Sequence, residues 1–512
     1  MRRWKPAPAN RIFSASLGFL AAACLVTVGF AQAQPAGFDR SPASAPAVGD
    51  PILLDTRQLA TPAGQQAASA LLRKAQELEQ VHVIVGLDLA IRDETELTPA
   101  QEDDQARALR RAQDDVAWRS AIPARMVVRY ETIPYMAAAV TRTQLGRLID
   151  DPGVVSIQAD FSVAQMPPDG APPPDAGPML AESVPLIKAH KLWQQGFRGE
   201  GMIVAVLSTG AEYTHPMLRG KVVAGLCRSG GVHLFCPNNT SSSDSKASGK
   251  NCNPAVFSGC EWGTRLSSIA AGKSGVLRGV AREAQLISGQ VYTGGGFGLS
   301  IRTIDVIGGL DRVLRLAKKF PAAAAGRAAG DSAIAAVVVD YNEPALRDTA
   351  CDALVPAMTD IINRLFRRGI ATVISSGHSG GNSGITFPAC IDKAIAVGST
   401  TKDDAVSSFS AHHALVDLMA PGSSINAATL GGGYQVLVGR TNLAAAHVAG
   451  AFALLRQVRP NATVNQILKA LRNGVPVTRN DVTKPRIDLV KAKSKLEKIL
   501  PAAPASGPAA VR

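Results

Sequence analysis

Two residues with side chains suited to acyl transfer follow short apolar runs of the sequence. Ser208 follows "MIVAVL" (202–207), and His378 lies within "SSGHSGGNSG" (375–384). A serine hydroxyl attacks a carbonyl group only when a base such as histidine lies within hydrogen-bonding distance. Ser208 and His378 end different strands, so we expect that they do not touch and that they form no nucleophile–base pair.

A third polar residue, Asn442, stands in the stretch "GRTNLAAAHVAGAFALL" (439–455). This stretch predicts the start of a long buried helix, and its alanines and Gly450 allow a neighbouring element to pack closely. Asparagine is among the best N-cap residues. We therefore expect Asn442 to cap this helix.

The elements that position these residues are short, almost wholly apolar runs between 181 and 490. Runs that are apolar on both faces are typical of parallel strands covered by helices on both sides. Helical stretches such as 355–369 fall between them. The pattern predicts an α/β domain with a doubly wound parallel sheet and a site at the carboxyl ends of its strands. The runs are 202–207, 284–292, 333–341, 370–377 and 393–399.

A smaller domain is expected before it, over residues 80–162. Its elements follow the order β-α-β-β-α-β of an α+β, ferredoxin-like unit. An Ala/Pro-rich and then helical lead (34–79) precedes this domain, a proline-rich linker (163–180) follows it, and a tail (491–512) ends the chain. The expected strands are 81–89, 126–132, 135–140 and 153–160, and the expected helices are 98–118 and 141–151.

The first 33 residues have the pattern of a secretory signal peptide. A basic segment, an apolar segment and "AQA" follow one another, which predicts cleavage after Ala33 and export to the periplasm or beyond the cell. A lipoprotein signal with Cys24 as the lipidated residue is the weaker alternative, because Ala21 stands where a branched apolar residue is expected. No later segment has 18 uninterrupted apolar residues, so we expect no permanent membrane anchor.

The composition argues against a nucleic-acid partner. The formal net charge is +13, but four of the basic residues lie in the signal peptide and the others are dispersed or lie on helix faces. Aromatic residues make up only 5% of the chain, whereas nucleic-acid surfaces need basic patches with interleaved aromatics.

Six cysteines remain once Cys24 is discounted. An even number in an exported chain favours three disulfides, and six cysteines allow 15 pairings. Zinc binding is the alternative, but the spacings lack paired CxxC motifs. We expect no metal and no cofactor. The spacing suggests Cys227–Cys236, Cys252–Cys260 and Cys351–Cys390.

Four motifs between 204 and 450 resemble the subtilisin-like serine proteases in their order. They are "VAVLSTGAEYTHP" (204–216), "WGTRLSSIAAG" (262–272), "SSGHSGGNSG" (375–384) and "GRTNLAAAHVAG" (439–450). Residues 81–160 resemble the propeptide inhibitor domain of the same family. The resemblance implies a peptidase fold with an inhibitory propeptide and covers about four-fifths of the chain.

The catalytic positions that the resemblance implies are all substituted. Ser208 stands at the position of the catalytic Asp, Trp262 at that of the His, His378 at that of the oxyanion Asn, and Asn442 at that of the nucleophilic Ser. The flanking residues match the family: Gly210, His215, Pro216, Gly263, Thr264, Gly272, Gly377, Pro388, Pro421, Gly422, Thr441, His447 and Gly450.

These substitutions predict a pseudo-protease without peptidase activity. An amide is a poor nucleophile, and an indole has only an N–H donor and accepts no proton. Trp262 is expected to fill the space of the missing imidazole, with ligand stacking as the alternative. His378 either donates to a bound carbonyl group or only replaces the family's Asn.

The expected partner of such a cleft is a peptide or protein segment, and the chain's own propeptide is one candidate. Without self-cleavage the propeptide should stay attached. The alternative functions are an active secreted endopeptidase with a non-standard site and a relic whose cleft has no function.

Overall fold

The computed structural model describes residues 51–164, 180–231, 233–275, 277–295, 298–321 and 332–501. The expected signal peptide, the start of the lead, most of the expected linker and half of the expected tail lie outside these ranges. Within them, no helix is long and apolar enough to cross a membrane.

The N-terminal α+β domain has an antiparallel five-stranded sheet with the order β1-β5-β2-β4-β3. The β-α-β-β-α-β order expected from the sequence is therefore present, and a short additional strand, β1, pairs with β5 at one edge. Each of its three helices begins after a threonine whose side chain accepts a hydrogen bond from the first helical turn. The elements are β1 (Leu53–Asp55), α1 (Pro62–Glu77), β2 (Val81–Leu87), α2 (Pro99–Arg119), β3 (Val127–Arg129), β4 (Tyr135–Val140), α3 (Arg142–Ile149) and β5 (Val154–Ala159).

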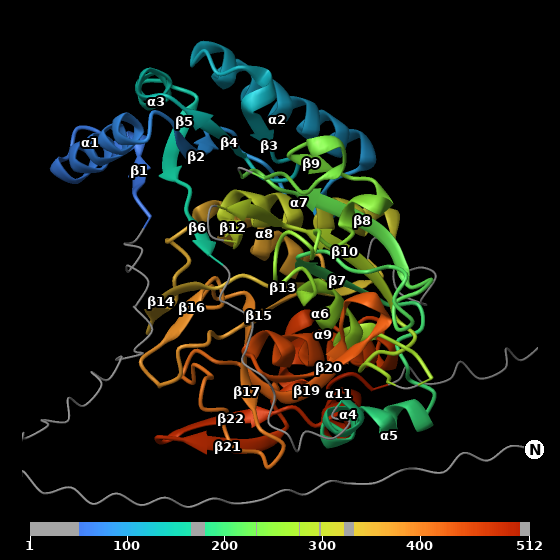
Figure 1. Cartoon of the computed structure of the whole chain (residues 1–512). Coiled ribbons are helices and arrows are strands. Elements are labelled where there is room, and N and C mark those ends of the chain that lie inside the picture. The colour runs from blue at the N-terminus through green and yellow to red at the C-terminus, as the bar shows by residue number, and fades with distance from the viewer. Residues whose placement is uncertain are drawn as a thin grey trace, which may run out of the picture. The chain divides into compact units, whose positions relative to one another are not determined.

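The larger domain contains a ten-stranded sheet, which confirms the expected doubly wound α/β class (Figure 1). Neighbouring strands are parallel from β8 to β22, and only the outermost strands β9 and β21 are antiparallel to their neighbours. In order across the sheet the strands are β21 (Val475–Arg479), β22 (Val482–Arg486), β18 (Leu418–Pro421), β17 (Ala394–Thr400), β15 (Ala371–Ser375), β13 (Ile334–Val339), β7 (Ile203–Ser208), β10 (Gln285–Gln290), β8 (Val222–Arg228) and β9 (Ser242–Ser243).

Helices cover both faces of this sheet, so its strands are apolar on both sides. In β7, Val204 and Val206 belong to a core with the side chains of α6 and α9, whereas Ile203, Ala205 and Leu207 belong to a core with those of α7 and α8. The helices are α4 (Leu180–Leu186), α5 (Ala189–Gln194), α6 (Trp262–Ala271), α7 (Thr303–Lys319), α8 (Pro356–Arg367), α9 (Thr441–Val458), α10 (Val464–Leu471) and α11 (Leu489–Ile499).

Two expected boundaries are wrong where the structure describes them. The tail does not start at 491, because α11 continues to Ile499 and buries Leu489, Ala492 and Leu496 in the core. Residues Val163 and Ala164, expected in the linker, belong to a strand, β6 (Ser162–Ala164). β6 completes a three-stranded sheet with β11 (Tyr292–Gly295) and β12 (Gly298–Arg302).

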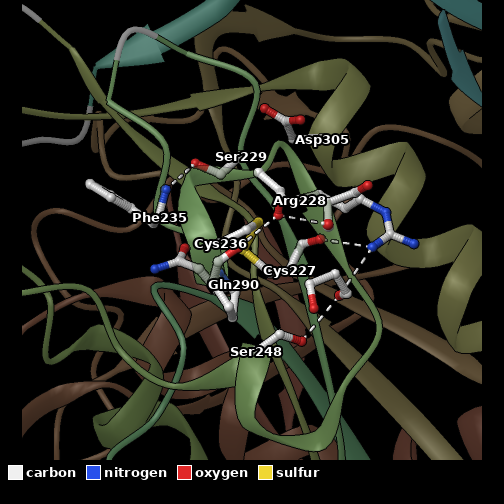
Figure 2. Close-up of a disulfide and its surroundings, with 12 residues drawn as sticks. Cys227, Arg228, Ser229, Phe235, Cys236, Ser248, Gln290 and Asp305 are labelled. Atoms are coloured by element: carbon white, nitrogen blue, oxygen red, sulfur yellow. Dashed lines mark hydrogen bonds between the residues drawn. A yellow bond between two sulfur atoms is a disulfide. The ribbon is translucent and has the colours of Figure 1, made fainter. Parts of the chain in front are cut away.

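The three disulfides suggested by spacing are all present. Cys227–Cys236 joins the end of β8 to the loop that follows it, where the Phe235 amide donates to Ser229 Oγ at 3.0 Å (Figure 2). The remaining strands form two antiparallel pairs: β14 (Glu343–Arg347) with β16 (Ile385–Phe387), and β19 (Ser423–Ala428) with β20 (Tyr434–Gly439).

Candidate functional site

The carboxyl ends of three neighbouring strands meet at the candidate site. β7 ends at Ser208, β13 ends directly before Asp340, and the loop after β15 carries His378. Because β13 lies between β7 and β15, Asp340 stands between the other two positions. Trp262 begins α6, and Asn442 is the second residue of α9.

Ser208, Asp340 and Asn442 form one buried hydrogen-bond network. Ser208 Oγ donates to Asp340 Oδ2 at 2.7 Å, and Asn442 Nδ2 donates to Asp340 Oδ1 at 2.9 Å. Their exposed fractions are 0%, 6% and 4%. The expectation that Asn442 caps α9 is wrong, because Arg440 is the N-cap residue and the Asn442 amide is directed to the carboxylate.

Burial raises the pKa of Asp340 above its usual value. The hydrogen bonds from Asn442 and Ser208 and the positive charge of Arg440 act in the opposite direction and favour the carboxylate. A buried carboxylate needs donors on its oxygens. Here two of the four substituted catalytic positions provide those donors.

Trp262 is buried beside two guanidinium groups. Its exposed fraction is 1%, and the guanidinium carbons of Arg265 and Arg440 lie 4.6 and 5.2 Å from its ring centroid. Both distances are within the range of cation–π interactions. The indole therefore has a packing role at the start of α6 and holds Arg440 next to the network.

His378 contacts Thr441, not Ser208. His378 Nδ1 and Thr441 Oγ1 are within hydrogen-bonding distance, and Thr441 Oγ1 also lies 3.1 Å from the Gly377 carbonyl oxygen, to which it can donate. Burial and then the charge of Arg440 lower the pKa of His378 to about 4, so its imidazole is neutral at pH 7. Ser208 and His378 thus have separate partners, as expected.

A cavity of about 270 Å³ joins these residues to the end of the N-terminal domain. Its lining includes Trp262, His378 and Asn442 on one side and Val163 and Ala164 of β6 on the other. β6 pairs antiparallel with β12, with Val163 opposite Ile301 and Ala164 opposite Ser300. An extended segment of the chain itself therefore lies beside the substituted catalytic positions.

The retained glycines explain how α6 and α9 reach this site. A Cβ atom at Gly450 would lie 2.7 Å from the carbonyl oxygen of Ala270, so α9 packs directly on the backbone of α6. A Cβ atom at Gly263 would lie 2.0 Å from the carbonyl oxygen of Gly210. These close contacts fix how α9 packs on α6 and how the first turn of α6 packs on the loop after β7.

The residues at the catalytic positions expected from the sequence lack the groups of the usual triad chemistry. The position of the base holds an indole, and the position of the nucleophile holds an amide that donates to Asp340. Sequence reasoning missed Asp340. A signal was present, since "AIAAVVVDYN" (333–342) places a carboxylate directly after a wholly apolar strand, where parallel sheets form their sites.

Fold and site together define a subtilisin-like α/β domain with a buried polar network of Ser208, Asp340 and Asn442 at the carboxyl ends of its strands. The chain belongs to the subtilase family, whose model matches residues 199–488. It is 29% identical over 371 residues to the alkaline protease of Alkalihalobacillus alcalophilus, with 71% of this chain and 80% of that protein covered. It is 30% identical over 299 residues to subtilisin Savinase of Lederbergia lenta, with 57% and 91% covered.

Proposed function

We propose that this chain is an exported, catalytically inactive subtilase homologue whose cleft binds an extended peptide segment. The observation that carries the proposal is the buried network of Ser208, Asp340 and Asn442. Acyl transfer by a triad needs a nucleophile, a base within reach of it and an acid that orients the base. In this network both partners of the acid are donors, and the base is absent.

The contacts of β6 support the peptide-binding part of the proposal. Strand addition to an exposed edge gives affinity through main-chain hydrogen bonds and selectivity through side-chain pockets. β6 adds to β12 in this way, and Arg302 on β12 forms an ion pair of 3.1 Å with Asp160, two residues before β6. We infer that residues 80–164 act as an attached propeptide and are the first occupant of the cleft.

One unpaired atom in the cleft indicates what a bound segment would contact. Asn442 Oδ1 is buried and has no hydrogen-bond partner among the described residues. A buried acceptor without a donor costs about 1–3 kcal/mol. A peptide N–H group in the cavity would relieve that cost.

The test is an activity assay on the purified full-length chain, with casein as substrate and a fluorophosphonate probe for an activated hydroxyl. We expect neither turnover nor labelling. We also expect one polypeptide from about Gln34, measured by intact mass. An N-terminus near Leu180 in protein prepared without other proteases would contradict the attached propeptide.

The contact between Thr441 and His378 favours a second candidate, an endopeptidase with a non-standard site. Among the described residues that line the cleft, this contact brings a hydroxyl to a neutral imidazole. Turnover that is lost in both Thr441→Val and His378→Gln, but kept in Ser208→Ala, would establish this second function. Turnover that survives all three substitutions would come from a contaminant.

A further inference from the structure

A cationic hollow lies in the larger domain, away from the cleft. We call it the arginine pocket, and its volume is about 370 Å³, within the range of about 300–1,000 Å³ that is usual for small-molecule sites. It is formed by α5, the turn before β7 and the turn before β10. Its lining residues are His190, Trp193, Gln194, Arg198, Arg278 and Arg282.

The arginine pocket and the cleft lie at opposite ends of the strands. Arg198 precedes β7, which begins at Ile203, and Arg282 precedes β10, which begins at Gln285. The cleft is built from the carboxyl end of β7. The pocket therefore belongs to no part of the candidate active site.

Three guanidinium groups share this hollow and repel one another. Burial lowers the pKa of Arg282 below its usual value, and the nearby charges of Arg278 and Arg198 lower it further. The acidic neighbours have other partners: Glu283 pairs with a lysine at 2.6 Å, and Glu200 accepts from a glutamine at 2.8 Å. Arg198 and Glu200 approach only to 3.8 Å. Glu283 and Glu200 raise the pKa of Arg282 again, but by less than burial and the two arginines lower it. Among the described residues that line the pocket, the cationic side chains are therefore only partly compensated, which indicates a site for an anion.

The donors of the pocket are held in place and still lack acceptors. The guanidinium of Arg282 lies over the ring of Trp193, 4.7 Å from its centroid, and Trp193 Nε1 donates to the Val280 carbonyl oxygen at 2.9 Å. Buried nitrogens of His190 (Nδ1), Arg198 (Nε) and Arg282 (Nε) have no hydrogen-bond partner in the part of the chain that the structure describes. The fixed ring positions Arg282 before any ligand arrives.

We propose that the arginine pocket binds a phosphate group, either of a free phosphate or of an anionic lipid headgroup. Guanidinium groups donate pairs of parallel hydrogen bonds to phosphate oxygens, and these charge-assisted bonds are roughly twice as strong as neutral ones. The three arginines of the arginine pocket can surround a tetrahedral anion. The negative charge of the ligand would also remove the repulsion among the three guanidinium groups.

The experiment measures binding of inorganic phosphate to the full-length chain by titration calorimetry in a chloride buffer. We expect saturable binding with an affinity that falls at least tenfold in Arg282→Gln and in Arg278→Gln. Arg278 is exposed, so its variant tests the pocket even if Arg282→Gln fails to fold. The matched control is Arg111→Gln, which removes an exposed arginine from α2 and should bind like the unchanged chain.

A second arm distinguishes the two sources of phosphate. Vesicles of phosphatidylcholine with about a third of phosphatidylglycerol are sedimented with the chain, with and without excess inorganic phosphate. Vesicle binding that phosphate displaces assigns the pocket to a headgroup, and phosphate binding without vesicle binding assigns it to a free phosphate. The proposal is overturned if neither probe binds saturably, or if both arginine variants bind like the control.

Discussion

Replacing Ser208 with aspartate restores the family's acid and should destabilise this chain. The hydroxyl of Ser208 donates to Asp340 at 2.7 Å, so Ser208→Asp would place a second carboxylate beside a buried one. At about 3 Å and an effective dielectric constant of about 20, two carboxylates repel by about 5.5 kcal/mol. One carboxyl group would therefore bind a proton in the folded state.

Binding of that proton limits the loss of stability in Ser208→Asp and makes the loss depend on pH. Protonating an acid with an ordinary pKa of about 3.9 costs roughly 4 kcal/mol at pH 7 and roughly 1.5 kcal/mol at pH 5. The folded state of Ser208→Asp binds a proton that the unfolded state has released. Its stability should therefore fall as the pH rises above about 4.

The assay is urea unfolding between pH 4 and pH 7, with Ser208→Asn as the matched control. Asparagine has the shape of aspartate but is neutral, and its amide can donate to Asp340. We expect Ser208→Asp to be about 4 kcal/mol less stable than Ser208→Asn at pH 7 and nearly equal to it at pH 4. Adding Asp340→Asn to Ser208→Asp should restore most of the loss. Equal stability of the two single variants at pH 7 would refute the proposed proximity of Ser208 and Asp340.

Three further outcomes test the packing, the covalent links and the buried histidines. Because the indole is buried, Trp262→Ala should lower the free energy of unfolding in urea by about 3–5 kcal/mol. The control Trp118→Ala, at a side chain that is 82% exposed, should change it by no more than about 0.5 kcal/mol. Equal losses in the two variants would contradict the packing role of Trp262. Replacing both Cys351 and Cys390 with alanine removes a disulfide that joins residues 39 apart and should lower the free energy of unfolding by about 4 kcal/mol. Removing either of the two short-range disulfides should lower it by about 2.5 kcal/mol. Thermal and urea unfolding can measure this difference. Burial lowers the pKa of His447 to about 4, so the folded chain resists its protonation and loses stability as the pH falls below about 6.5. His447→Asn should reduce that slope by about 1.4 kcal/mol per pH unit, measured from pH 6.5 to 4.5, and an unchanged slope would show that His447 is not buried and neutral.

The sequence predicted the large elements because their burial is visible in the local pattern. A strand covered on both faces is apolar at every position, and the runs at 202–207, 333–341 and 370–377 became β7, β13 and β15 with ends shifted by at most two residues. The cysteine pairing also followed from spacing, since two of the three links close short loops.

Two elements, β1 and the continuation of α11, were not predicted from the sequence. β1 has three residues, too few for a periodic pattern, and depends on pairing with β5. α11 had a readable signal: Asp488 accepts hydrogen bonds from the first turn, and Leu489, Ala492 and Leu496 recur on one face.

The contacts that define the site could not be predicted from local patterns. Asp340 is 132 residues from Ser208 and 102 from Asn442, and only the strand order of the folded sheet places them together. Asn442 has the right residue type for an N-cap. The N-cap residue of α9 is Arg440, which lies beside Trp262, and Asn442 stands two residues further along, inside the helix.

The residues at the expected catalytic positions are matched to one another in hydrogen bonds and charge. A cleft that had only lost its catalytic residues would not need such matched partners. A carboxylate at 340 requires donors, and Ser208 and Asn442 are donors, whereas the family's acid and nucleophile at these positions would supply a second charge and a shorter side chain. The position of the imidazole holds an indole that stacks with Arg440, whose charge favours the carboxylate of Asp340. Changing Ser208 to aspartate would place a like charge beside Asp340, and changing Asn442 to serine would remove the amide that donates to Asp340 Oδ1.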